Sequence, residues 1–100
     1  MNRKQESFVL RAAVRVFGED NQLRMLLEEM SELQKEICKY WRGENNYSAI
    51  AEEITDVQIT LDQAKLIFAN AGPLSLLRER KLRRLWSRIV QKCEEDEDGR

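Results

Sequence analysis

The fold of this chain is decided by two stretches with the same chemical pattern, LLEEMSELQ at residues 26–34 and IAEEITDVQ at residues 50–58. In both, two glutamates are followed by an apolar residue, a hydroxyl residue, an acid, a second apolar residue and a glutamine. Apolar residues recur at intervals of three and four through both stretches, which is the period of a helix buried along one side. The pattern therefore predicts two amphipathic helices that carry the same acidic motif.

The composition around these stretches also favours helix. Only one proline and four glycines occur among the 100 residues, 42% of the residues are hydrophobic and 35% are charged. We find no period-two alternation of useful length that would indicate a strand. The sequence thus predicts an all-α fold. Because a four-helix chain of this length has a thin core, we also expect copies of the chain to associate.

Four helices are predicted from capping residues, chain breakers and apolar spacing. Gly18 is expected to end the first helix, Asp20 or Asn21 to cap the second, and Ser48 to cap the third. The predicted ranges are about residues 5–17, 22–41, 49–70, and 74 or 75 into the early 90s. A short polar loop joins the second and third helices, so we expect them to be antiparallel neighbours.

The net charge of −1 conceals two segments of opposite charge near the C-terminus. Residues 78–88 contain six basic residues and one glutamate, whereas residues 94–98 are all acidic. A run of like charges at a chain end is typical of a solvated tail. We therefore assign residues 1–93 to a single all-α domain and residues 94–100 to an acidic disordered tail.

Nothing in the sequence indicates secretion or a membrane anchor. The first 17 residues lack the continuous apolar segment of a signal peptide, and no apolar run approaches the roughly 20 residues that span a bilayer. The spacing of Cys38 and Cys93 matches no metal or redox motif. We expect a soluble, cytoplasmic protein with no membrane partner.

The repeated motif places acidic side chains in pairs. At about 100° per residue, Glu29 and Glu32 lie roughly 60° apart on their helix, and Glu53 and Asp56 repeat this arrangement on the next. If the two apolar stripes pack together, the four carboxylates converge at the edge of the core and repel one another unless a cation neutralises them. Oxygen ligands in a chain without histidine favour Mg²⁺, with Mn²⁺ as an alternative, over zinc. Two simpler readings stay open: solvated glutamates on amphipathic helices, and a structural ion site without chemistry.

At these residues the sequence resembles the all-α nucleoside triphosphate pyrophosphohydrolases, the MazG-like and dimeric dUTPase-like superfamily. Their signature is a Glu-x-x-Glu on one helix and a Glu-x-x-Asp on the next, present here as EEMSE at residues 28–32 and EEITD at residues 52–56. The resemblance implies a four-helix MazG-like bundle, completed by oligomerisation as a homodimer or homotetramer. It also implies Mg²⁺-dependent hydrolysis of an NTP or dNTP to the nucleoside monophosphate and pyrophosphate.

The resemblance also implies roles for individual residues. The implied metal ligands are Glu29, Glu32, Glu53 and Asp56. The general base is left open among Glu28, Glu32 and Glu36. The candidate substrate-binding residues are Lys35, Lys39, Arg42, Asn70, Lys81 and Arg84. Trp41 either stacks on a nucleotide base or continues the apolar stripe into the core.

A second class of function fits one part of the sequence. The basic run RERKLRRLWSR at residues 78–88 is suited to contacts with phosphates. The alternative function is therefore a non-catalytic helical oligomer that binds nucleic acid or another anionic partner through the fourth helix. Because acidic residues dominate elsewhere, we do not expect nucleic acid to be the main partner.

Overall fold

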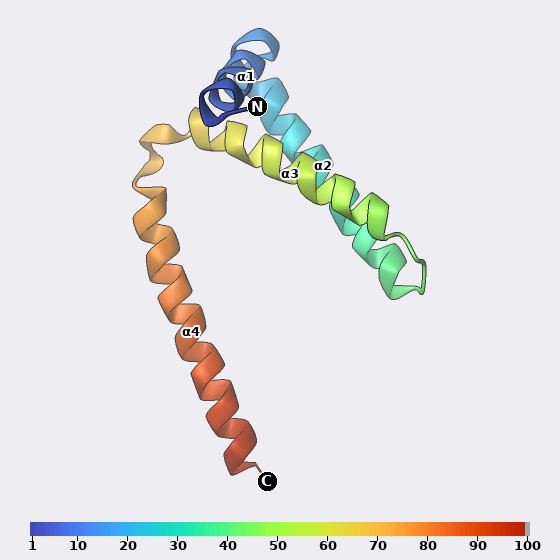
Figure 1. Ribbon diagram of the computed structural model, residues 1–100, viewed down its shortest axis with the longest axis vertical. Helices are drawn as coiled ribbons and strands as arrows, with labels where there is room; N and C mark the ends of the chain where they lie inside the picture. The colour runs from blue at the N-terminus through green and yellow to red at the C-terminus, as the bar shows by residue number, and fades with distance from the viewer. Residues whose placement is uncertain (100) are drawn as a thin grey trace. The chain divides into compact units, whose positions relative to one another are not determined.

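The computed structural model describes residues 1–99, and 88% of these residues are helical. The elements are α1 (Arg3–Phe17), α2 (Glu19–Trp41), α3 (Tyr47–Ile67), a short 3-10 helix (Ala69–Ala71) and α4 (Leu74–Asp98), with no strand in the described range (Figure 1). The all-α prediction is confirmed. The chain divides into two compact units, Met1–Ala69 and Asn70–Arg100, and each is described by itself.

The α1 helix begins two residues earlier than predicted because Asn2 forms a capping box. The Asn2 Oδ1 accepts a hydrogen bond from the Gln5 backbone N–H at 2.9 Å, and the Gln5 Oε1 accepts one from the Asn2 N–H at 2.8 Å. The helix ends at Gly18 as predicted, with a φ of 93° that favours glycine. The Gly18 N–H closes the last turn on the Val14 carbonyl at 2.9 Å.

The start of α2 differs from the prediction. The helix begins at Glu19, directly after Gly18, so Asp20 and Asn21 lie inside its first turn and neither is the cap. The Asn21 side chain is instead engaged with the preceding helix, where its Nδ2 donates to the Phe17 carbonyl at 2.8 Å. Glu19 and Asp20 still favour this helix terminus, since acidic side chains interact well with the positive end of the helix dipole.

The bounds of α3 also differ. The helix begins at Tyr47 after Asn46, so Ser48 lies within the first turn and is not the N-cap. Asn46 ties this end of α3 to α2, because its Nδ2 donates to the Glu36 carbonyl at 2.9 Å. At the other end α3 stops at Ile67, three residues before the predicted end, and the chain continues as the short 3-10 helix.

In the first unit, α2 and α3 form an antiparallel hairpin, and α1 packs at the end away from the connecting loop (Figure 1). Gln22 near the start of α2 meets Gln63 near the end of α3, which confirms the predicted antiparallel pairing. The buried core is small: the buried residues are Gln22, Thr60, Gln63 and Ala64. Most large apolar side chains therefore keep substantial exposure to solvent.

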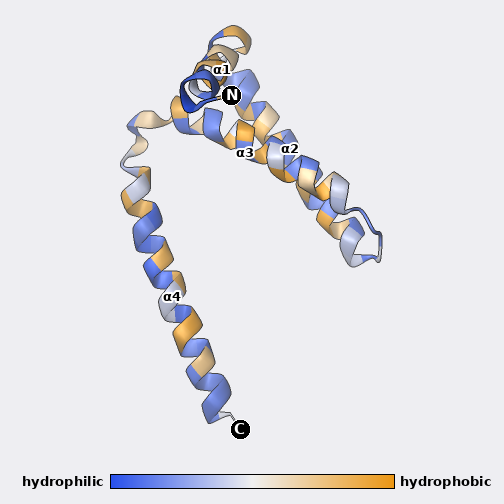
Figure 2. Cartoon of the chain, in the orientation of Figure 1, coloured by the Kyte–Doolittle hydropathy of each residue, from blue (hydrophilic) through white to orange (hydrophobic). Residues whose placement is uncertain are grey.

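The second unit consists mainly of α4, on which every described residue is exposed. Apolar and charged residues alternate along it at helical spacing (Figure 2). The helix starts at Leu74 as predicted, but it continues through the acidic run to Asp98, where we expected a disordered tail. An ion pair of 3.3 Å between Lys92 Nζ and Asp96 Oδ1 joins this run to the preceding turn. Arg100, the last residue of the predicted tail, lies outside the described residues.

No helix in residues 1–99 combines the length and the apolar character needed to cross a bilayer.

The Gln22–Gln63 pair gives a test of the hairpin. Gln22 Nε2 donates to Gln63 Oε1 at 2.6 Å, and both side chains are buried. We expect Gln22→Ala to lower the free energy of unfolding by about 1–3 kcal/mol, because a buried amide is left without its partner. Gln22→Ala combined with Gln63→Ala should cost less than the sum of the two single changes, because the pair is lost in either one. Urea unfolding in a double-mutant cycle measures this, with the exposed Gln58→Ala as control. Additive single effects would contradict a direct coupling.

Candidate metal centre

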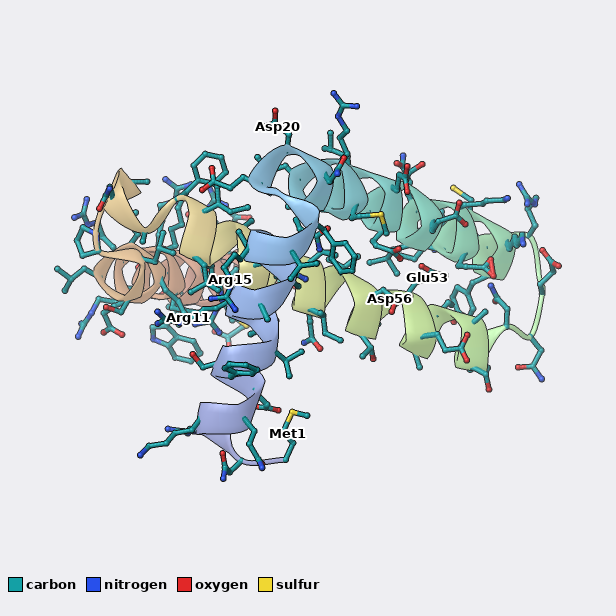
Figure 3. The ribbon with its side chains drawn as sticks, turned by 90° about the horizontal axis from the view of Figure 1, so that it is seen from above. Met1, Arg11, Arg15, Asp20, Glu53 and Asp56 are labelled. Atoms are coloured by element: carbon teal, nitrogen blue, oxygen red, sulfur yellow. The ribbon has the colours of Figure 1, made fainter. Side chains whose placement is uncertain are left out.

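Three carboxylates from two helices form an acidic cluster, composed of Glu29 on α2 and of Glu53 and Asp56 on α3. Each contributes one carboxylate oxygen that lies within 4.8 Å of the oxygens from the other two. Glu53 and Asp56 project from the side of α3 that faces α2 (Figure 3). The antiparallel packing explains the meeting, because positions one turn apart on α3 share the face that α2 covers.

The cluster is partly withdrawn from solvent and lacks positive partners. Glu29 and Glu53 are half-buried, whereas Asp56 is exposed. The buried Oε2 of Glu53 has no hydrogen-bond partner. Among residues 1–99, no lysine or arginine forms an ion pair with any of the three carboxylates. A buried carboxylate oxygen without a donor is unfavourable, so a cation would complete this arrangement.

The electrostatics agree with the geometry. Burial raises the pKa of the Glu29 carboxyl above its ordinary value of 4.5, and the negative charges of Asp56 and Glu53 raise this pKa further. The folded chain therefore resists placing a third full negative charge at this point. Mg²⁺ and Mn²⁺ prefer negatively charged oxygen ligands, and the three carboxylates of the cluster are ligands of this kind.

The structure brings together three of the four predicted metal ligands. Glu32, the fourth, is exposed and lies outside the cluster, one turn beyond Glu29 on α2. Among the base candidates, Glu28 is also exposed. Glu36 is half-buried, and its Oε2 lies 3.1 Å from Lys39 Nζ. The two groups form an ion pair, although their angles do not meet those of a hydrogen bond. Glu36 and Lys39 are therefore engaged with each other.

The remaining predicted substrate-binding residues are all exposed. Lys35 lies on α2, and Arg42 follows the last turn of this helix. The other three belong to the second unit: Asn70 is in the 3-10 helix, and Lys81 and Arg84 are one turn apart on α4. Their contact with a substrate at the acidic cluster stays a prediction.

An apolar groove in the first unit was not predicted from the sequence. It has a volume of about 490 Å³, and its lining residues are Met30, Leu33, Gln34, Ile37, Cys38, Trp41 and Val57. Met30 and Val57 directly follow the cluster residues Glu29 and Asp56 in sequence. The apolar stripe of the second helix was the available signal, but periodicity alone does not separate a core position from the wall of an open groove.

Comparisons with family models, with curated proteins and with solved structures find no match to this chain. The functional inference therefore depends on the acidic cluster, on the groove and on the motif itself.

The raised pKa of Glu29 predicts a pH dependence of stability. A carboxyl whose pKa is higher in the folded state binds its proton more tightly there than in the unfolded state. Its favourable contribution to the free energy of unfolding is therefore fully present below pH 4.5 and is lost as the pH rises through the raised pKa. Glu29→Gln should remove this loss and stabilise the metal-free chain near neutral pH by up to about 1 kcal/mol, the scale of partly exposed charge pairs. Urea unfolding in EDTA across this pH range measures it. An equal gain from the exposed Glu52→Gln would contradict the assignment to the cluster.

Repulsion between the cluster carboxylates destabilises the folded chain, and a bound divalent cation should stabilise it. At about a hundred times its dissociation constant, a cation that binds only the folded chain adds about 2.7 kcal/mol to the free energy of unfolding. We expect Mg²⁺ and Mn²⁺ to raise the melting temperature of the natural chain and of Glu52→Gln, but not of Glu53→Gln. Potassium at matched ionic strength is the control for screening. A shift of equal size in Glu53→Gln would place the ion elsewhere.

Proposed function

We propose that this protein is a Mg²⁺-dependent nucleoside triphosphate pyrophosphohydrolase of the MazG-like type. It converts an NTP or dNTP and water into the monophosphate and pyrophosphate. The acidic cluster of Glu29, Glu53 and Asp56 carries the proposal, since it joins two matched motifs, excess negative charge and an unpartnered carboxylate oxygen at one place.

The cluster residues would hold the ion, with Glu32 as the further ligand one turn along α2. When bound, Mg²⁺ or Mn²⁺ would neutralise phosphate charge and polarise the scissile phosphoanhydride. The residues themselves set the position of this charge, because α2 and α3 fix the backbone of all three ligands. Their half-buried setting keeps part of the bulk water away from Glu29 and Glu53.

A second carboxylate must accept the proton of the attacking water. Glu28 and Glu32 flank Glu29 on α2 and are exposed, so substrate and water have access to both. Glu36 has its carboxylate paired with Lys39 and would have to leave this ion pair before it accepted a proton. The ion pair therefore favours Glu28 or Glu32 as the general base.

The apolar groove supports a nucleotide rather than an inorganic polyphosphate as substrate. Its volume of about 490 Å³ falls within the usual range of small-molecule sites. Trp41 lines it and is 76% exposed, so the indole face is available to stack on a base. Cationic side chains would contact the phosphates; the proposed set is Lys35, Lys39, Arg42, Lys81 and Arg84, with Asn70 for the sugar or base.

We also propose that the protein works as a homodimer or homotetramer. Ala64 is the one buried apolar residue among those described, whereas Leu27, Leu85 and Trp86 are each more than half exposed. Association of copies would remove part of this apolar surface from water and so complete the bundle.

Pyrophosphate release from a panel of canonical and modified NTPs and dNTPs, with and without Mg²⁺, tests the activity. We expect Glu29→Gln, Glu53→Gln and Asp56→Asn each to lower kcat by on the order of 100-fold or more, because each removes negative charge that would position the ion. Circular dichroism should show that each variant remains helical. Glu52→Gln, the exposed neighbour of Glu53, is the matched control and should keep its turnover.

Retained turnover in all three cluster variants would overturn the proposed site. The release of inorganic phosphate in place of pyrophosphate would instead overturn the reaction class. Salt-sensitive binding of nucleic acid that survives Glu29→Gln and Glu53→Gln, without any hydrolysis, would favour the non-catalytic alternative.

A further inference from the structure

The helix α4 carries an apolar stripe that no other described residue of the second unit covers. Leu85 is 51% exposed and Trp86 is 64% exposed, and Leu82 and Ile89 on the same side are also exposed. Steps of four and three residues in alternation, the spacing of the contact positions in a two-helix coiled coil, extend this stripe to one charged residue at its N-terminal end and two at its C-terminal end. The seam residues are Arg78, Leu82, Leu85, Ile89, Lys92 and Asp96.

The two ends of this seam have opposite charge. Arg78 and Lys81 lie at its N-terminal end, and Glu95 and Asp96 lie at its C-terminal end. Arg78 and Asp96 are 18 residues apart on one helix, a separation of about 27 Å at 1.5 Å per residue. These charges cannot meet within one α4. The ion pairs that do form within the helix, Arg83 with Glu79 and Lys92 with Asp96, each span one turn.

A second α4 in antiparallel orientation pairs apolar residues at the centre and opposite charges at the two ends in one register. Between them, Leu82 lies opposite the partner's Lys92, whose aliphatic stem packs on it while the ammonium group stays in water. When Leu85 lies opposite Ile89 of the partner subunit, Arg78 lies opposite the partner's Asp96. Lys81 then flanks the seam beside the partner's Glu95, and Trp86 lies next to the two-fold axis. Parallel pairing would instead set basic segment against basic segment and acidic segment against acidic segment, which costs free energy.

We propose that α4 pairs antiparallel with α4 of a second copy of this chain, with Leu82, Leu85 and Ile89 at the centre and Arg78 and Lys81 facing the partner's acidic residues. The inference rests on the self-association included in the proposed function and on none of its chemistry. Charge complementarity favours a second α4 as the partner of this helix, because its acidic C-terminal end matches the basic N-terminal end of the first.

Two charge-reversed forms of the full chain test the register. The acidic form carries Arg78→Glu and Lys81→Glu, and the basic form carries Glu95→Lys and Asp96→Lys. Each should be at least 10-fold weaker in self-association than the natural chain, because all four seam-end charges then have one sign. An equimolar mixture should recover the natural affinity, since each form supplies the charges that the other needs. Sedimentation equilibrium at low ionic strength measures all three, and circular dichroism checks helicity.

Matched controls place the same charge changes away from the seam. Arg80→Glu with Arg84→Glu, and Glu94→Lys with Asp98→Lys, alter residues on the opposite side of α4 and should leave the dissociation constant within about 2-fold. A chain with Trp41→Phe isolates the fluorescence of Trp86, which should shift to shorter wavelength as the dimer forms.

Three outcomes would overturn the inference. A monomeric natural chain would mean that nothing pairs with α4 from a second copy. Self-association that both charge-reversed forms retain would place the interface on another surface. If an equimolar mixture of the acidic and basic forms did not regain the natural affinity, the antiparallel register would be excluded. Pyrophosphate release is measured separately, so a failed interface and a failed hydrolase remain distinguishable.

Discussion

The carboxylates of Glu29, Glu53 and Asp56 are held together by the packing of α2 against α3, although each repels the other two. The α2–α3 hairpin sustains this repulsion because polar contacts fix its register at both ends: Gln22 with Gln63 near α1, and Asn46 with the Glu36 carbonyl near the loop. The cluster lies between these two contacts. Any shift of one helix along the other would separate the carboxylates and break both hydrogen bonds. The excess negative charge is therefore a property of the fold and not of one rotamer.

The repeated motif gives the hairpin an approximate two-fold relation that the side chains then break. In an antiparallel pair, the first acid of each motif faces the last acid of the other, so Glu29 faces Asp56 and Glu32 faces Glu53. Three of these four carboxylates come together, and Glu32 remains in solvent. Spacing on a helix predicts which face a residue occupies. It does not predict the rotamer, which for an exposed glutamate depends on the charges and ions around it.

The order and type of the helices could be predicted from the sequence, because apolar periodicity and the breakers Gly18 and Pro73 are local signals. The helix starts were less accurate. Asn2, Asn21 and Asn46 have similar capping propensity, but Asn2 alone forms a capping box, while the other two donate to carbonyls of the preceding helix. Competing contacts of this kind depend on tertiary geometry. The apolar groove was missed for a related reason, since a stripe such as that of Ile37 and Trp41 has the same sequence pattern whether it is covered or open.

The position of charges around α4 limits how the two proposed uses of this helix combine. At about 100° per residue, Arg84 lies on the side of α4 away from Leu82, Leu85 and Ile89, whereas Lys81 lies beside them. Antiparallel pairing therefore engages Lys81 with an acidic residue of the partner subunit and leaves Arg84 open to a ligand. Arginine also matches phosphate better than lysine, because its planar group donates two parallel hydrogen bonds. If both proposals hold, Arg84 stays available to a phosphate group, and Lys81 serves the assembly.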